Sequence, residues 1–316
     1  NVVAEEAIRN NIKDEFDVKT SDGLIKCKNI VVATGAFQKP VTPSIIPEQE
    51  GLNQFHSQFY KNPDQLEEGA ILVVGSGSSG SQIAQELMLS GKKVFLSIGP
   101  HNRPPRRYRG KDNVWWFGVL GVWQQKTPDP NTQHVTIAVS GYEGGKTIDF
   151  RNFANQGMNL IGMTKNFKDG KLFFENDLKQ NLDNGDKNYL SVLDQADEYI
   201  KKNNLNFPEE PEARNITPDP NCVIKPLLEL DIKKENIKNI IWATGYQYDF
   251  NWLKVDTFDS TGKPEHYRGV GKEKGIYFIG LPWLSMRGSS FIWGVWQDAK
   301  YLAEQISKKD NIKIAN

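Results

Sequence analysis

Apolar and polar positions alternate most regularly in the middle of the chain. The apolar run Ala70–Val74 predicts a short buried strand, and Val94–Ile98 predicts a second one. Between them, Gly80–Ser90 places its apolar residues on one helical face, and Gly91 follows where a left-handed helix cap favours glycine. This order predicts a β-α-β unit.

The same kind of pattern predicts further elements on both sides of this unit. They are a buried strand at Ile30–Ala33, a hairpin turn at Lys168–Lys171, a helix over residues 186–202, a strand at Gly275–Ile279 and a closing helix from about Ser290 to Ile306. Residues 100–220 are otherwise irregular, with scattered Asn, Asp and Pro. Strands alternating with helices indicate an α/β fold.

A short sequence occurs twice, far apart in the chain. "NIVVATGAF" begins at Asn29, and "NIIWATGYQYDF" begins at Asn239. Each reads as a buried strand that ends in Ala-Thr-Gly, at Thr34–Gly35 and at Thr244–Gly245. The repetition indicates two related nucleotide-binding units, each with a strand that ends near its ligand.

Composition narrows the class of protein. A length of 316 residues suggests about two domains, and 39 basic against 39 acidic side chains give no overall field for nucleic acid or an anionic membrane. Cys27 and Cys222 form no CxxC pair, which favours a reducing, cytoplasmic compartment and disfavours a dithiol centre. No apolar run has the roughly 18 residues of a membrane span.

The turn after the first strand of the β-α-β unit has the spacing of a dinucleotide-binding loop. Gly75, Gly77 and Gly80 stand as G-x-G-x-x-G between a strand and a helix. The first glycine permits the tight turn, the second permits close approach to a pyrophosphate, and the third permits close helix packing. The alternative, an ordinary glycine turn, is disfavoured by this framing. Residues expected to surround the pyrophosphate are Gly75, Ser76, Gly77, Ser78, Ser79 and Gly80.

The end of the second strand bears on the choice of nucleotide. NAD sites usually place a carboxylate there, whereas this chain has Ser97-Ile98-Gly99-Pro100. The loop that follows carries four arginines whose guanidinium groups suit a 2′-phosphate: Arg103, Arg106, Arg107 and Arg109. We therefore expect NADP(H) rather than NAD. The alternatives are a solvated basic loop or a small nucleic-acid patch.

Other chemistry-bearing stretches are less specific. The aromatic run from Asp112 to Trp123 fits a buried core or a substrate channel equally well. The stretch "FHSQFY" contains His56 and Tyr60, and a lone loop histidine is most often structural. No catalytic triad, carboxylate pair or metal-ligand spacing is present in the sequence, so no metal is expected.

Six stretches together carry a resemblance to a known family. They are "NIVVATGAFQKP", "FHSQFYKNP", "VVGSGSSGSQIAQEL", "PPRRYRGKDNVWW", "IIWATGYQYDFNWL" and "FIGLPWLSMRGSSFIWGVWQDAKYLA", between residues 29 and 303. In this order they resemble the flavin-dependent monooxygenases with two dinucleotide-binding domains, which include flavin-containing, YUCCA-like and Baeyer–Villiger enzymes. The sequence is most similar to the bacterial YUCCA-like flavoprotein oxidoreductases.

The resemblance implies two Rossmann-like domains, with an NADP domain inserted in an FAD domain. The implied division is residues 1–66 and 236–316 for FAD, and 67–235 for NADP. NADPH would reduce FAD, and a C4a-peroxyflavin formed with O₂ would oxygenate a small organic substrate at nitrogen, sulfur or a carbonyl carbon. By the same resemblance, Thr34–Gly35 and Thr244–Gly245 would lie near the nucleotides, and His56 and Tyr60 would match the family's identifying motif.

Three departures from the family pattern stand out. The chain has no G-x-G-x-x-G for FAD, so we expect the FAD domain to be incomplete at its N-terminus. Glu50 and Leu52 replace the Phe and Gly of the identifying motif, and Leu281 follows Gly280 where the family has Asp. No catalytic acid or base is expected, and Arg287 in "LSMRGSS" is a candidate flavin or substrate contact.

The sequence thus predicts a flavin-dependent NADPH monooxygenase that uses FAD and NADP(H), a small-molecule substrate and O₂. The alternatives are a truncated, non-catalytic NADP-binding protein and an NADPH-dependent flavin reductase without oxygenation. Neither nucleic acid nor a membrane span is expected. The oligomeric state is not set by the sequence, and a homodimer is one option.

Overall fold

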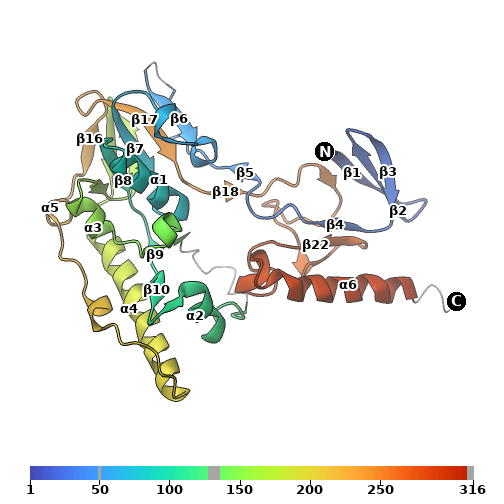
Figure 1. Cartoon of the computed structure of the whole chain (residues 1–316). Helices are drawn as coiled ribbons and strands as arrows, with labels where there is room; N and C mark the ends of the chain where they lie inside the picture. Colours follow the sequence, from blue (N-terminus) through green and yellow to red (C-terminus); the bar gives the residue numbers. More distant parts are fainter. Residues whose placement is uncertain (49–50, 127–135, 312–316) are drawn as a thin grey trace. The chain divides into compact units, whose positions relative to one another are not determined.

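The computed structural model describes residues 1–48, 51–126 and 136–311, which form two compact units (Figure 1). Unit 1 comprises Asn1–Lys39, Gly121–Thr132 and Tyr246–Asn316, and unit 2 comprises Pro40–Leu120 and Gln133–Gly245. These borders differ from the predicted division at 66/67 and 235/236. The reason is that β6 (Asn53–His56) and β17 (Ile237–Trp242) pair with each other in the central sheet of unit 2. Glu50, one of the expected departures, lies outside the described residues.

A five-stranded parallel sheet forms the centre of unit 2. Its order is β13-β8-β7-β17-β6, with β13 at Asn159–Ile161, β8 at Val94–Ser97 and β7 at Ala70–Val74. All five residues of β7 are buried, which explains why this strand is continuously apolar rather than alternating. The two strands predicted from the apolar runs are thereby confirmed, with β8 one residue shorter than expected.

Helices cover this sheet and complete unit 2. They are α1 (Ser78–Leu89), α2 (Asn113–Val119), α3 (Phe150–Asn155), α4 (Leu178–Lys202) and α5 (Asn221–Ile224). Helix α1 packs Ile83, Ala84 and Leu87 into one core cluster with residues of β7 and β8. It begins two residues before the predicted start, and Gly91 has the expected positive φ of 81°. Helix α4 begins eight residues earlier than predicted.

The remaining short strands form small sheets of two or three strands. They are β14 (Thr164–Lys168), β15 (Lys171–Phe174) and β16 (Glu229–Asp231) in one antiparallel sheet, β9 (His101–Asn102) with β12 (Thr136–Ile137), β10 (Arg107–Tyr108) with β11 (Lys111–Asp112), and β5 (Lys39–Pro40) with β18 (Tyr246–Gln247). The hairpin predicted at Lys168–Lys171 joins β14 to β15 and is confirmed. Short 3₁₀ turns lie at Ser57–Phe59, Pro63–Gln65, Tyr142–Gly144 and Pro211–Arg214.

Unit 1 contains two four-stranded sheets and one long helix. The first sheet has the order β19-β1-β2-β3 and the second β20-β21-β22-β4. Their bounds are β1 (Ala4–Asn10), β2 (Glu15–Thr20), β3 (Gly23–Cys27), β4 (Ile30–Val32), β19 (Leu253–Lys254), β20 (His266–Tyr267), β21 (Val270–Gly271) and β22 (Ile276–Phe278). The strands predicted near Ile30 and Ile276 are confirmed, and they pair in parallel. The strand at Ile276 is buried as expected, whereas β4 is buried only at Val32, because Val31 faces solvent.

Helix α6 (Val295–Asn311) closes unit 1 (Figure 1). It begins five residues after the predicted start, because Arg287–Ser290 form a separate 3₁₀ turn before it. In the described part of the chain, no helix combines the length and the apolar character that crossing a membrane requires.

Candidate nucleotide site and neighbouring residues

Two glycines shape the turn between β7 and α1, because a Cβ atom at either position would collide with the backbone. At Gly75, φ is +107° and a Cβ would lie 2.5 Å from the carbonyl oxygen of Ala243. At Gly80, a Cβ would lie 1.9 Å from the carbonyl oxygen of Gly75. The backbone of the turn therefore packs directly on the first turn of α1 and on the residue after β17. This is the close packing that the G-x-G-x-x-G spacing predicts.

The N-terminus of α1 leaves backbone donors for an anion. Its N-cap is Gly77, which supplies no side-chain cap, and Ser79 in the first turn is exposed. The Ser78 hydroxyl is engaged elsewhere: it donates to Ile137 O at 3.0 Å and accepts from Val139 N at 3.3 Å. A pyrophosphate here would thus be held by backbone N–H groups and the helix dipole rather than by Ser78. Ser76 is buried.

The end of β8 carries no negative charge. The Ser97 hydroxyl donates to Gly162 O at 2.9 Å and accepts from the Thr164 hydroxyl at 2.9 Å. Ile98 and Gly99, which follow, are uncharged as well. An adenosine ribose beside this strand would meet no carboxylate from these residues, which suits a 2′-phosphate better than a 2′-hydroxyl.

Three of the four expected arginines are paired with carboxylates. Arg103 is 5% exposed and donates two hydrogen bonds to Asp186 Oδ1, at 2.9 and 2.6 Å. Arg106 contacts Asp112 at 2.6 Å, and Arg109 contacts Asp197 at 2.7 Å. These three guanidinium groups are thus paired with carboxylates of unit 2.

Arg107 differs from the other three. It is exposed, and its Nη2 donates to Gly144 O at 2.8 Å. Within the described residues it forms no ion pair, so its charge remains available to an anion. The sequence alone had no means of separating it from its neighbours, because Asp186 and Asp197 are distant in the chain and Asp112 lies within reach of more than one arginine in sequence.

His56 fixes the turn that follows β17. Its Nδ1 accepts from Gln58 N at 3.1 Å, so the proton lies on Nε2, which donates to Gly245 O at 2.9 Å. Burial lowers the pKa of His56, so the neutral form persists. Thr244 also takes part, donating its hydroxyl to Val41 O. His56, Thr244 and Gly245 therefore form one hydrogen-bonded group, which the sequence placed in separate motifs.

Tyr60, Thr34 and Gly35 have other hydrogen-bond partners. The Tyr60 hydroxyl donates to Glu86 on α1 at 3.0 Å, and burial raises its pKa above the usual range. In unit 1, Gln38 Nε2 donates to the Thr34 hydroxyl at 3.0 Å and to Gly35 O at 2.8 Å, and Gln38 Oε1 accepts from Asp249 N. Sequence reasoning missed Gln38, whose role follows only from the fold.

Arg287 lies in the 3₁₀ turn before α6. Its guanidinium is centred 5.7 Å from the ring of Trp283, and burial lowers its pKa. The aromatic run from Asp112 divides between two roles: Trp116 is fully buried in unit 2, whereas Trp123 belongs to unit 1 and packs on Phe291. For Trp116 the core interpretation holds.

Cysteine and metal chemistry find little support in the structure. Cys27 and Cys222 are both free and belong to different units, and burial raises the pKa of each thiol. Protonated thiols are weak nucleophiles, which disfavours thiol–disulfide exchange. No cluster of three or more metal-ligating side chains occurs in the described ranges.

The two expected cofactors fit the described residues to different degrees. The glycine turn, the open α1 N-terminus and the uncharged end of β8 fit the pyrophosphate and phosphorylated ribose of NADP(H). Strand β4 in unit 1 ends at Val32, just before Thr34–Gly35, and no G-x-G-x-x-G turn joins it to a helix in the residues described there. We therefore assign no residue of this chain to the FAD pyrophosphate.

Comparisons with known proteins identify the family of the chain. A family described as pyridine nucleotide-disulphide oxidoreductase matches residues 4–111. An uncharacterized CzcO-like oxidoreductase of Geobacillus kaustophilus is 33% identical over 298 residues, covering 92% of this chain and 68% of that protein. The chain belongs to the CzcO-like oxidoreductases of the flavin monooxygenase family.

More distant relatives extend the comparison. A probable indole-3-pyruvate monooxygenase, YUCCA4 of Arabidopsis thaliana, is 24% identical over 323 residues, covering 97% of this chain and 67% of that protein. The solved structure of a flavin-containing monooxygenase from Stenotrophomonas maltophilia has a TM-score of 0.58 at 14% identity, covering 98% of this chain and 70% of that one. At that identity the likeness establishes the fold, which is the predicted α/β class with two Rossmann-like domains.

Proposed function

We propose that the protein is an FAD- and NADPH-dependent monooxygenase that inserts one oxygen atom of O₂ into a small organic substrate at nitrogen, sulfur or a carbonyl carbon. The observation that carries the proposal is the β7–α1 turn, whose glycines pack on Ala243 and leave backbone donors at the helix N-terminus. Membership of a flavin monooxygenase family supports the flavin chemistry. When bound, FAD accepts a hydride from NADPH and, once reduced, reacts with O₂.

The residues of this chain would bind and orient the nicotinamide cofactor. Backbone N–H groups at the start of α1 would hold the pyrophosphate, in the orientation that the glycine packing sets. His56 and Thr244 would keep the turn after β17 rigid beside Gly75, since Ala243 touches that glycine. No side chain is assigned a proton transfer, because oxygen insertion at a sulfide requires none from the protein.

Arg107 would select NADPH over NADH. It is the arginine of the loop that is exposed and paired with a carbonyl oxygen rather than a carboxylate. A guanidinium without a carboxylate partner can form charge-assisted bonds to a 2′-phosphate, which NADH lacks.

Oxygen uptake tests the reaction class. The protein reconstituted with FAD should consume O₂ and NADPH in equal amounts when it converts a substrate such as methyl phenyl sulfide to its sulfoxide. A flavin reductase would oxidise NADPH and yield hydrogen peroxide without an oxygenated product. A preparation that neither retains FAD nor oxidises NADPH contradicts the enzyme proposal and favours a non-catalytic NADP-binding protein.

Substitution of Arg107 tests the choice of nucleotide. Arg107→Ala should raise the KM for NADPH by about 10-fold or more and change the KM for NADH by less than about 2-fold, as loss of a charge-assisted bond predicts. The matched control is Arg214→Ala, because Arg214 is exposed in the same unit but is paired with Asp194 and Asp197. Equal effects of Arg107→Ala on both nucleotides would remove Arg107 from the proposal.

A further inference from the structure

Arg287 is a half-buried cation without an anion. In the residues that the structure describes, its guanidinium forms no ion pair with a carboxylate, and the guanidinium carbon lies 5.7 Å from the centroid of the Trp283 ring. Burial lowers its pKa, and no opposite charge offsets that effect. Desolvating a charge is unfavourable unless an anion or hydrogen bonds compensate. The arrangement therefore suits a ligand that brings a negative charge.

The backbone is strained at Trp283, the residue whose ring lies near the Arg287 guanidinium. Trp283 has a φ of +58°, in the left-handed region that a bulky side chain rarely adopts. Such strain persists only where surrounding contacts enforce it, and it concentrates at ligand sites. Here Ser289 Oγ accepts from Ser285 N and Met286 N, each at 3.1 Å, and fixes the segment between Trp283 and the 3₁₀ turn.

A buried carboxylate anchors the same segment to α6. Asp298 is fully buried and accepts the Ser285 hydroxyl through Oδ1. Asp298 therefore ties the segment before the Arg287 turn to the first turn of the helix. Among the described residues, Asp298 forms no ion pair with Arg287, so the guanidinium charge remains available to a ligand.

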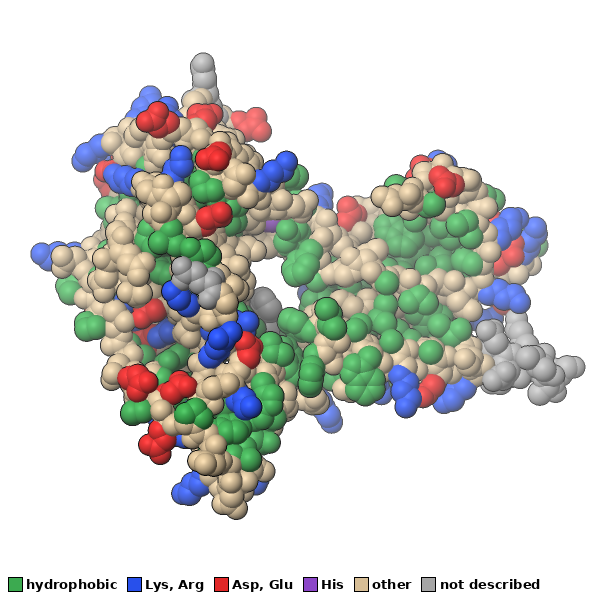
Figure 2. All heavy atoms as spheres, viewed as in Figure 1, with side chains coloured by type: hydrophobic (Ala, Val, Ile, Leu, Met, Phe, Trp, Pro, Cys, Tyr) green, Lys and Arg blue, Asp and Glu red, His purple; other side chains and the backbone are tan. Residues whose placement is uncertain are grey.

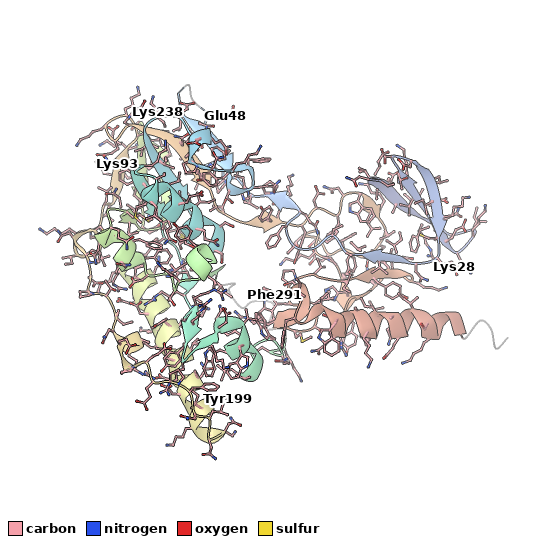
Figure 3. All side chains as sticks on the ribbon, viewed as in Figure 1. Lys28, Glu48, Lys93, Tyr199, Lys238 and Phe291 are labelled. Carbon is pink, nitrogen blue, oxygen red and sulfur yellow. The ribbon has the colours of Figure 1, made fainter. Side chains whose placement is uncertain are left out.

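Exposed aromatic side chains follow Arg287 in the sequence, up to the first turn of α6. Phe291 is 45% exposed, Trp293 55% and Trp296 58%, and Phe291 packs on Trp123 with ring centroids 5.1 Å apart. Figure 3 shows Phe291 just before α6, and Figure 2 shows hydrophobic side chains gathered on the surface of unit 1. Large exposed apolar groups of this kind mark interaction sites. They suit an apolar molecule, aromatic or aliphatic.

We propose that Arg287 and Trp283 bind the carboxylate of the substrate, whose apolar body lies on the aromatic residues at the start of α6. The substrate class is thus an organic acid with an apolar or aromatic body. This inference rests on the proposed oxygenation. For a sulfide acid the reaction balances as sulfide, O₂, NADPH and one proton giving sulfoxide, water and NADP⁺: the sulfur is oxidised, NADPH supplies two electrons, and the second oxygen atom leaves as water.

Paired probes that differ only in charge test the proposal. The full chain reconstituted with FAD is titrated calorimetrically with (phenylthio)acetate, 3-phenylpropionate and heptanoate, and with the methyl ester of each. The unmodified protein should bind at least one of the acids about 10-fold or more tightly than its ester. Arg287→Met should abolish that preference and leave ester binding within about 2-fold, and Arg287→Lys should restore part of it. The control is Arg268→Met, since Arg268 also lies over an aromatic ring, Tyr301, in unit 1.

Three outcomes decide the matter. If the unmodified protein binds no acid more tightly than its ester, or if Arg287→Met keeps the preference, the proposal is wrong. If Arg287→Met, but not Arg268→Met, loses bound FAD, the anion belongs to the cofactor, and the proposal is wrong in a different way. If acid binding depends on Arg287 but no sulfoxide forms, the anion site stands and the proposed oxygenation fails.

Discussion

The Ala-Thr-Gly turns at residues 33–35 and 243–245 have the same sequence, but their surroundings differ. The strand before 243–245 is buried from Asn239 to Trp242, whereas Val31 in the strand before 33–35 is exposed. At 243–245, Gly245 O accepts from both His56 Nε2 and Val41 N, and Ala243 lies against Gly75 of the glycine turn. At 33–35, Thr34 is exposed, and Gln38 supplies the side-chain hydrogen bonds. The turn in unit 2 is thus held by segments distant in the chain, and the turn in unit 1 by a neighbouring side chain.

The comparison shows that the repeated sequence determines where the strand ends and which backbone conformation the turn adopts. The contacts that stabilise each turn come from residues outside the repeat. Both glycines adopt a positive φ, +71° at Gly35 and +82° at Gly245, with open space where a Cβ would lie. The shape is thus local. The nucleotide turn next to 243–245 depends on contacts between segments about 170 residues apart, such as Gly75 with Ala243. Substitutions in the two units should therefore have unequal effects.

The largest difference should be between glycines of the two units. Gly80→Ala places a methyl group 1.9 Å from Gly75 O, so we expect a loss of about 3 kcal/mol or more in the free energy of unfolding, together with loss of NADP⁺ binding. Gly35→Ala has open space and only the strain of a positive φ, which costs about 1 kcal/mol. Urea unfolding of both variants measures the difference. Equal losses would refute the contrast between a packed and an open turn.

Removing the side chains that support each turn should give a smaller difference. His56→Ala removes bonds to Gly245 O and Gln58 N from a residue that is 2% exposed, and should lower the free energy of unfolding by about 2–3 kcal/mol. Gln38→Ala should lower it by about 1 kcal/mol, because Thr34 can exchange its bond with water. The same unfolding experiment applies, and a larger loss for Gln38→Ala would reverse our ranking of the two supports.

The smallest expected effect is a pH dependence. Burial lowers the pKa of His56 below its usual 6.5 in the folded protein, so between the two values the unfolded chain binds more protons. Stability from this group is complete above pH 6.5 and is lost as pH falls through the folded pKa. His56→Gln should make the free energy of unfolding less dependent on pH below 6.5. An unchanged dependence on pH would show that the pKa of His56 does not change on unfolding. Burial also lowers the pKa of His101, so some pH dependence of the free energy of unfolding should remain in the variant.

Much of the fold was predictable because it follows local patterns. A stretch of about twenty residues is enough to recognise the buried strand β7, the glycine turn and the apolar face of α1. The unit borders were not, since β6 and β17 join one sheet across a long stretch of chain. The site was predictable only to the level of motifs: Arg103, Arg106 and Arg109 are neutralised by Asp186, Asp112 and Asp197, and side-chain partners of this kind have no signature in the sequence.

The most direct test of the central claim is calorimetric titration of the full chain with NADP⁺ and with NAD⁺. The glycine turn, the uncharged end of β8 and the available charge of Arg107 predict binding of one NADP⁺ per chain, about 10-fold or more tighter than NAD⁺. Gly80→Ala should abolish both. Equal affinities for the two nucleotides, or unchanged binding in Gly80→Ala, would contradict the account.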